Sequence, residues 1–288
     1  RDKLVTGVQT CALPISGEYR IIHAVGFDSA GGVLAYSLLN RRLVRFDPSS
    51  GRSETHQLPM PPTYLDAALV AGRVLAVANP GGAVGDSAEV GVYALEPGAR
   101  AGRLLRPLGA RDVTFPLDAM REMPGLFAPT TRWALAPDGA VWHSTGREWS
   151  VRRYPADGGP TLVVRALVEG RAVTPGDIEG QLGARLRRLP AGPMRDAAEA
   201  RLRNAATRHP PITDLHPALD GGAWVREAPR EGMDSVAWVL LARDGAPRGR
   251  LWLAEADRPL VARDSTVLLV RDGRAEGAAL VRAVLRGP

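Results

Sequence analysis

The stretch Gly31-Gly32-Val33-Leu34-Ala35-Tyr36-Ser37, a glycine turn followed by a short apolar run, decides the fold because the same pattern recurs along the chain. Glycine supplies the positive φ of a tight turn, and short runs rich in apolar and aromatic residues favour β-strands. Four later segments repeat the pattern, the last of them more weakly: 72–78, 139–144, 221–226 and 264–270. The recurrence predicts that one small β-sheet unit is built five times.

A second turn, marked by aspartate and glycine, follows most of these runs. It reads Asp47-Pro48-Ser49-Ser50-Gly51, Asp157-Gly158-Gly159 and Asp244-Gly245 in three of the units. An apolar run precedes each turn, and Asp-Gly between such runs is a strong hairpin signal because the tight turn needs positive φ. Each unit is therefore predicted to be a four-stranded antiparallel meander.

The spacing of the units indicates a repeat architecture. Gly31 and Gly72 are 41 residues apart, and Gly222 and Ser265 are 43 apart. Two longer gaps hold insertions at about 108–130 and 167–212, and the rest of the chain provides about 41 residues for each of five units. Four strands in roughly 40–50 residues make one blade of a β-propeller.

We therefore expect an all-β chain, a β-propeller of four-stranded antiparallel blades, five of them visible, with a helical insertion at about 167–212. A β-sandwich or jelly roll is the alternative, because it also carries regular hairpins. Neither of these folds predicts Asp and Gly at the same two places in every unit, so the propeller is favoured.

The first sixteen residues do not fit the pattern. Residues 5–15 read Val-Thr-Gly-Val-Gln-Thr-Cys-Ala-Leu-Pro-Ile, which is the translation of a common sequencing adapter. We interpret 1–16 as a non-native adapter-derived scar and expect the propeller domain to occupy 17–288. On this interpretation the chain is truncated at its N-terminus, any signal segment is lost, and the intact protein has six blades.

Composition excludes several classes of protein. The only cysteine, Cys11, and the only lysine, Lys3, fall in the first sixteen residues, which leaves the rest without disulfides or cysteine-bound metals. The net charge of +6 comes from arginines spread among acidic residues, which favours a solvated surface over a nucleic-acid partner. No run of roughly 18 apolar residues occurs, so the sequence predicts no transmembrane segment.

The insertion at 167–212 carries the clear helical signal of the sequence. Thr174-Pro175 supplies an N-cap followed by proline at the first helical position. Apolar residues then follow at helical spacing: Ile178, Leu182, Leu186 and Leu189. Pro190 ends this helix, and a second helix is expected over 194–208. We expect the apolar stripe to pack on the propeller, and a helix that binds a partner is the alternative.

Three segments together resemble bacterial six-bladed β-propeller proteins of the TolB-like and NHL-like kind. Segment 149–165 ends in a strand, 173–178 reads Val-Thr-Pro-Gly-Asp-Ile before a helix, and 220–225 reads Asp-Gly-Gly-Ala-Trp-Val. The resemblance spans most of 17–288 and is concentrated in 133–270. It implies a propeller fold and an exported protein, whether periplasmic, secreted or a lipoprotein. Five units instead of six is a departure that a lost N-terminus explains.

No catalytic motif stands out in the sequence. The five histidines are dispersed and form no metal-binding pair, and there is no nucleophile elbow or phosphate-binding loop. His143 lies in mid-strand beside Trp142, where a packed histidine is expected. The tryptophans recur at strand positions and are expected between blades, with a ligand platform as the alternative: Trp133, Trp142, Trp149, Trp224, Trp238 and Trp252.

The meander topology places a candidate site. The Asp-Gly hairpins share one end of the sheets, so the blade-to-blade links, and with them both insertions, share the other end. Long loops on a rigid scaffold are where binding residues gather. We therefore expect ligand or partner binding at the insertion end, near the channel mouth, and the candidate residues are Asn79, His143, Arg226, Glu227 and Arg230.

We expect a non-catalytic extracytoplasmic β-propeller that acts as a binding or scaffold module for a protein, peptide or glycan partner, with no cofactor. The scarcity of histidine and the lack of an acid–base constellation favour this expectation. The alternative is a metal-dependent propeller hydrolase or lyase of lactonase type, with a divalent metal at the channel mouth held by Asn79, His143, Asp86 and Glu227.

Overall fold

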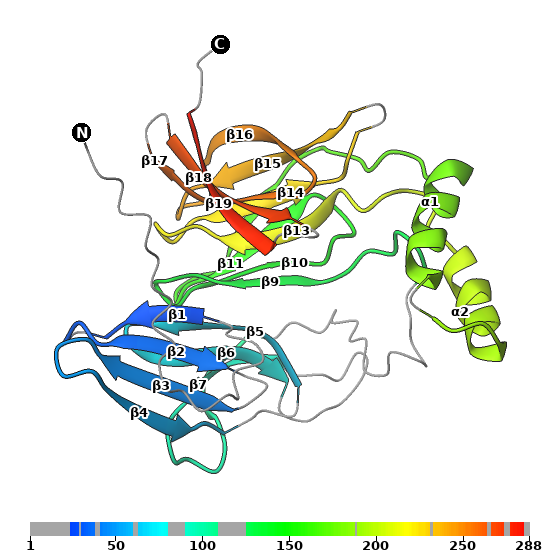
Figure 1. Cartoon of the computed structure of the whole chain (residues 1–288). Coiled ribbons are helices and arrows are strands. Elements are labelled where there is room, and N and C mark those ends of the chain that lie inside the picture. The colour runs from blue at the N-terminus through cyan, green and yellow to red at the C-terminus, as the bar shows by residue number, and fades with distance from the viewer. Residues whose placement is uncertain are drawn as a thin grey trace, which may run out of the picture.

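The computed structural model describes residues 24–28, 30–37, 41–59, 63–79, 90–108, 125–187, 189–230, 233–263, 266–273 and 277–284. These residues form five antiparallel sheets and two short helices (Figure 1). The segment 1–16, interpreted above as an adapter-derived scar, lies outside the described residues, as does the expected start of the domain at residue 17.

Four of the sheets have four strands, and each strand pairs with its neighbour in chain order. The first sheet holds β1 (Ala24–Phe27), β2 (Val33–Ser37), β3 (Arg42–Asp47) and β4 (Arg52–Gln57). The second holds β5 (Thr63–Val70), β6 (Arg73–Asn79), β7 (Gly91–Leu95) and β8 (Arg103–Pro107). The third holds β9 (Arg132–Leu135), β10 (Val141–Ser144), β11 (Ser150–Tyr154) and β12 (Leu162–Arg165). The fourth holds β13 (Ile212–Pro217), β14 (Ala223–Glu227), β15 (Ser235–Leu241) and β16 (Pro247–Ala254).

The fifth sheet has three strands, β17 (Asp257–Arg263), β18 (Thr266–Gly273) and β19 (Gly277–Val284). The first strands of successive sheets contact one another, β1 with β5, β5 with β9 and β9 with β13. This arrangement is a five-bladed β-propeller, so the fold class predicted from the repeat is confirmed. The fifth blade differs from the prediction, because β19 forms its outer edge within the described residues. A sixth blade stays a prediction.

The turns between the first and second strands of four sheets distinguish the two ends of the propeller. We call the end that carries the turns 28–32, 71–72, 136–140 and 218–222 the hairpin end, and the opposite one, with the blade-to-blade links, the insertion end. Gly72 and Gly139 occupy the left-handed region in their turns, with φ of +76° and +80°. A residue with a Cβ is strained there, so the glycines of the repeat fix where each strand reverses.

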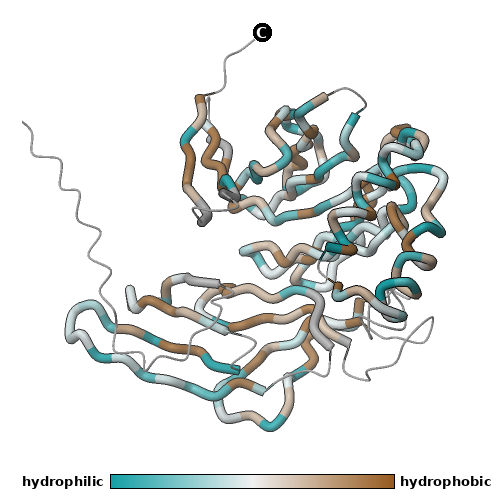
Figure 2. Tube along the Cα trace, turned by 45° about the vertical axis from the view of Figure 1, so that its right-hand side comes forward, coloured by the Kyte–Doolittle hydropathy of each residue, from teal (hydrophilic) through white to brown (hydrophobic). Residues whose placement is uncertain are grey.

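Apolar clusters fill the spaces between neighbouring sheets, and Figure 2 shows hydrophobic residues along the strands. Five of the six tryptophans are buried, as the sequence predicts. Trp252 is the exception, with 40% of its surface exposed. It lies on the outer strand β16, where alternate side chains face solvent, and the guanidinium of Arg230 lies 4.8 Å from its ring centroid. The core position expected for Trp252 is therefore wrong.

The insertion at 167–212 forms two helices, α1 (Pro175–Leu186) and α2 (Pro193–Arg203), beyond the insertion end of the sheets (Figure 1). The predicted N-cap Thr174 is present, but α2 ends at Arg203, five residues before the expected end. The apolar stripe of α1 packs on α2 and the other insertion instead of the propeller. We call this group the insertion cluster, and its buried members are Leu126, Leu182, Leu186, Ala198 and Leu202. No helix within the described part of the chain is long and apolar enough to span a membrane.

Candidate functional site

The two insertions meet at the insertion end and hold each other through the backbone. The N–H of Leu126 donates to the carbonyl of Leu202 (3.3 Å), and the N–H of Ala206 donates to the carbonyl of Leu126 (2.9 Å). Phe127 follows with φ of +60°, a strained conformation for a residue with a Cβ. Both hydrogen bonds belong to Leu126, the residue before Phe127, and the ring centroid of Phe127 lies 4.4 Å from that of His209.

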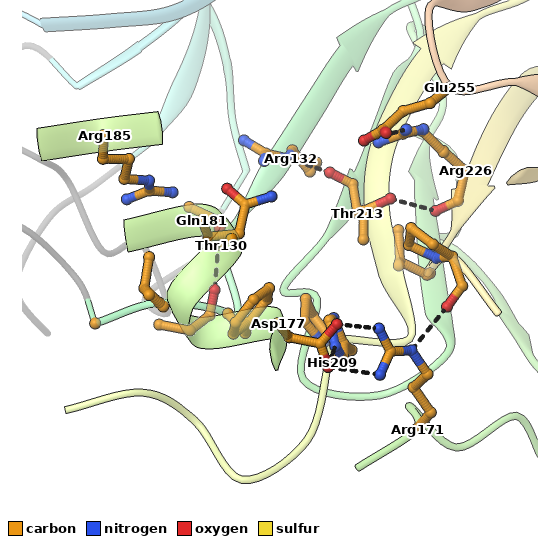
Figure 3. A pocket seen from close by; sticks show the side chains of 18 of the residues that line it. Thr130, Arg132, Arg171, Asp177, Gln181, Arg185, His209, Thr213, Arg226 and Glu255 are labelled. Carbon is orange, nitrogen blue, oxygen red and sulfur yellow. Dashed lines mark hydrogen bonds and ion pairs between the residues drawn. The ribbon is translucent and has the colours of Figure 1, made fainter. Parts of the chain in front are cut away.

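A pocket of about 530 Å³ opens between α1 and the ends of the strands that face it (Figure 3). Its wall comes from the described end of the first insertion, the polar side of α1, and the ends of β9, β13 and β14. Connecting segments complete it with Arg171, His209, Pro210, Pro229 and Glu255. The lining mixes polar and apolar residues and includes four arginines. Figure 3 shows the side chains of these arginines: Arg132, Arg171, Arg185 and Arg226.

The N-terminus of α1 is fixed to the propeller by Asp177. Arg171 donates to both of its carboxylate oxygens, at 2.6 and 2.7 Å. Thr174 donates to Asp177 through its backbone N–H and its hydroxyl, and accepts from the N–H of Asp177 in return, which completes a capping box. Arg171 also donates to the carbonyl of Pro229, so this network joins the helical insertion to the loop after β14.

The protonation states of this network follow from its contacts. The hydrogen bonds from Arg171 hold the pKa of Asp177 well below its usual range, so the carboxylate is ionised at neutral pH. His209 is buried, with Nε2 3.3 Å from Asp177 Oδ2. Burial lowers the pKa of His209, while Asp177 acts in the opposite direction. Asp177 therefore serves to position α1, and it has no proton to donate.

The other side of the pocket is built around an irregularity in β13. The pairing of β13 with β14 shifts register between Ile212 and Asp214, which leaves Thr213 as the extra residue of a bulge. Thr213 accepts a hydrogen bond from Arg132 Nε at its carbonyl oxygen (3.0 Å). Its hydroxyl donates to the carbonyl of Glu227 (3.2 Å), so the bulge orients Arg132 from the first strand of the neighbouring sheet.

The pocket carries more positive than negative charge. Asp177 is paired with Arg171, and Arg226 Nη2 lies 3.8 Å from Glu255, whose side chain is 74% exposed. Arg132 and Arg185 form no ion pair with any carboxylate in the part of the chain that the structure describes, although Arg132 is close enough to help lower the pKa of Asp214. Guanidinium groups in this situation bind carboxylate or phosphate oxygens.

Of the candidate residues named from sequence, Arg226 lies in this pocket. Glu227, the next residue on β14, is buried and accepts hydrogen bonds from Trp149 Nε1 (3.0 Å) and Arg250 (2.9 Å). Arg230 lies over Trp252, outside the pocket lining. The structure therefore separates three residues that are close in sequence.

His143 lies apart from these residues. His143 is buried in the third sheet against the ring of Trp133, 4.2 Å away between ring centroids. Asn79 ends β6, and its side chain, like Asp86, lies outside the described residues. Within the described ranges no three His, Cys, Asp or Glu side chains come together as metal ligands.

Sequence reasoning missed most of the pocket. Gln181 and Arg185 are one helical turn apart on α1, beside the stripe of Leu182 and Leu186. This spacing could have indicated the pocket, because polar residues next to the buried stripe of a helix lie at the border of the surface that the helix packs on. Arg132 gave no comparable signal, since its role depends on the bulge at Thr213.

Comparisons with known proteins find distant likeness in fold. No family model and no curated protein matches the chain. Among solved structures, a streptogramin B lyase is 11% identical with a TM-score of 0.38, and covers 93% of this chain and 70% of its own. Regucalcin, a calcium-binding protein from Agrobacterium tumefaciens, is 14% identical with a TM-score of 0.30 (87% and 81% covered). The allergen Mala s 1 of Malassezia sympodialis is 10% identical with a TM-score of 0.38 (91% and 78% covered). At these values the matches assign no ligand or activity to this chain.

Proposed function

We propose that this propeller is a non-catalytic binding module, and that a protein, peptide or glycan partner inserts a carboxylate into the pocket under α1. The observation that carries the proposal is the pair Arg132 and Arg185. They face one pocket from a strand and a helix, and neither is ion-paired to a carboxylate within the described residues.

The chemistry of the lining favours binding over catalysis. Arginine stays protonated at neutral pH, so it supplies charge and hydrogen bonds but no proton transfer. The titratable groups that line the pocket are engaged, with Asp177 held by Arg171 and His209 packed against Phe127. The export expected from the family resemblance belongs to the same proposal, because it would expose the pocket to partners outside the cytoplasm.

The pocket can be tested with two carboxylate probes on the whole chain, a fluorescein-labelled hexaglutamate peptide and trigalacturonate. The variants Arg132→Gln and Arg185→Gln remove one guanidinium each. Arg187→Gln is the matched control, because Arg187 caps the same helix, is exposed, and does not line the pocket. Loss of one charge-assisted hydrogen bond should weaken binding by about tenfold or more.

We expect saturable binding of at least one probe, weakened by added salt and by either pocket variant but unchanged in Arg187→Gln. The preferred probe distinguishes a peptide partner from an acidic glycan. Absence of saturable binding by both probes, or equal effects of Arg185→Gln and Arg187→Gln, would refute the proposal.

A further inference from the structure

A second pocket, of about 320 Å³, lies at the hairpin end, between the second and third sheets. The turns 71–72 and 136–140 form part of its rim, so it opens at the end of the sheets opposite to α1 and α2 (Figure 1). Its lining is mostly apolar, unlike that of the pocket under α1. The apolar side chains that surround it are Val70, Leu75, Val92, Leu105 and Ala156.

At this pocket the second sheet differs from the first and the third. In the first and third sheets an aspartate of the first turn pairs with an arginine of the third strand, Asp28 with Arg45 and Asp138 with Arg153. Arg45 pairs across the sheet with Leu34, and Arg153 pairs with Trp142. Leu34 and Trp142 both come three residues after the glycine of the first turn. In the second sheet the matching residue, Leu75, lies opposite Ala94.

The turn aspartate is missing from the second sheet as well. Ala71 precedes Gly72 in the turn, with φ of +48°. Ala94 thus stands where the first and third sheets have an arginine, and apolar side chains line the pocket at this end of the second sheet. Leu105, on the outer strand β8, is 44% exposed at this site, which is high for a large apolar side chain.

Two arginines line this pocket: Arg73, which is exposed, and Arg106, whose guanidinium is only partly used. Arg106 Nη2 donates to the carbonyl of Tyr154 (3.2 Å). Its Nε is buried and has no hydrogen-bond partner among the described residues. Asp138, the acidic residue of the lining, already pairs with Arg153 (2.7 Å) and Arg243 (3.1 Å). Burial lowers the pKa of Arg106, while the nearby carboxylate of Asp157 acts in the opposite direction.

We propose that the hairpin-end pocket binds a small apolar carboxylate, with its apolar body among Val70, Leu75 and Leu105 and its acid group at Arg106. The volume lies at the small end of the range for ligand pockets, roughly 300–1,000 Å³, which suits a molecule about the size of a fused bicyclic acid. The site is independent of the proposed binding of a partner under α1.

The test uses 2-naphthoate and its uncharged amide, 2-naphthamide, in calorimetric titrations of the whole chain. Ala156→Leu places extra carbons in the pocket from an exposed turn position. Ala99→Leu is its matched control, because Ala99 is also exposed in a turn and does not line the pocket. Arg106→Met removes the guanidinium, and Arg103→Met is the control on the same strand, outside the lining.

We expect one-site binding of 2-naphthoate, at least tenfold tighter than that of the amide. Ala156→Leu should weaken it at least tenfold and Arg106→Met should reduce the preference for the acid, while both controls bind as wild type does. Absent saturable binding, equal affinity for acid and amide, or equal effects of Ala156→Leu and Ala99→Leu would overturn the proposal. If circular dichroism shows that Arg106→Met does not fold, the proposal is judged from two results: the comparison of Ala156→Leu with Ala99→Leu, and that of 2-naphthoate with 2-naphthamide.

Discussion

Replacing Asp177 by asparagine should loosen α1 while leaving the propeller intact. Asparagine keeps the shape of the side chain but removes its charge, so Arg171 loses its bidentate partner. Exposed ion pairs contribute about 0.2–1 kcal/mol, and breaking a buried pair costs about 3–5 kcal/mol. The side chain of Arg171 is 24% exposed and that of Asp177 is 19% exposed, so this ion pair lies between the exposed and the buried case. We therefore expect a loss of about 2 kcal/mol, or roughly a 30-fold increase in local opening.

Hydrogen exchange measured by mass spectrometry resolves this effect by segment. Amides of α1 should exchange roughly 30-fold faster in Asp177→Asn, while those of β10 and β14 keep wild-type rates. Asp196→Asn is the matched control, since Asp196 also lies in the first turn of a helix, α2, and is exposed. Equal exchange of α1 in wild type and Asp177→Asn, or equal effects of the two variants, would refute the role assigned to Asp177.

The same contact predicts a pH dependence. Because the pKa of Asp177 is lowered in the folded state, chiefly by Arg171, its stabilisation is present above about pH 4 and is lost as the pH falls below that value. After correction for intrinsic rates, protection of α1 should decrease on acidification in the wild type. The decrease should be smaller in Asp177→Asn, and an equal decrease in both would contradict the assignment.

Three further predictions concern the propeller itself. Burial raises the pKa of Asp66 to about 6, so the free energy of unfolding should fall by about 2 kcal/mol between pH 4 and 8. Denaturant titrations should find that this fall is absent in Asp66→Asn. Glu227→Gln should cost about 2 kcal/mol in chemical denaturation, because Arg250 and Trp149 lose a charged acceptor, whereas Glu148→Gln at an exposed position should have no effect. The edge strand β19 exposes 64% of Leu280 and 66% of Val284, so Leu280→Lys and Val284→Lys should reduce self-association in light scattering, whereas Leu219→Lys, exposed in a turn, should not.

The fold was predictable because its signals are local. A glycine at φ of +76° or +80° can be recognised from the residues around it, and so can the Thr174 N-cap with Pro175 after it. The insertion cluster was not predictable in this way. Leu126 meets Leu202 across 76 residues of chain, so the stripe of α1 finds a partner outside the propeller.

The site was harder for the same physical reason. Arg226 and Glu227 are neighbours on β14, and neighbouring side chains on a strand point to opposite faces, so at most one of them faces a given pocket. Naming both as ligand residues overlooked this alternation. The orientation of Arg132 depends on a register shift at Thr213, and the position of Arg185 depends on where the two insertions meet. Neither feature can be predicted from a short stretch of sequence. Binding at Arg226 stays a prediction.

The helical insertion leaves and re-enters the propeller at almost the same point. Ala172 and Arg208 form an antiparallel bridge, and the N–H of His209 donates to the carbonyl of Arg171 (2.9 Å). Gly170 lies so close to the carbonyl of His209 that a Cβ would not fit between them. Chain ends that lie this close permit exchange of everything between them without disturbing the scaffold. Residues 173–207 are thus a cassette: a short turn could close the gap, and a different pair of helices grafted there would change the pocket at the insertion end of the same propeller.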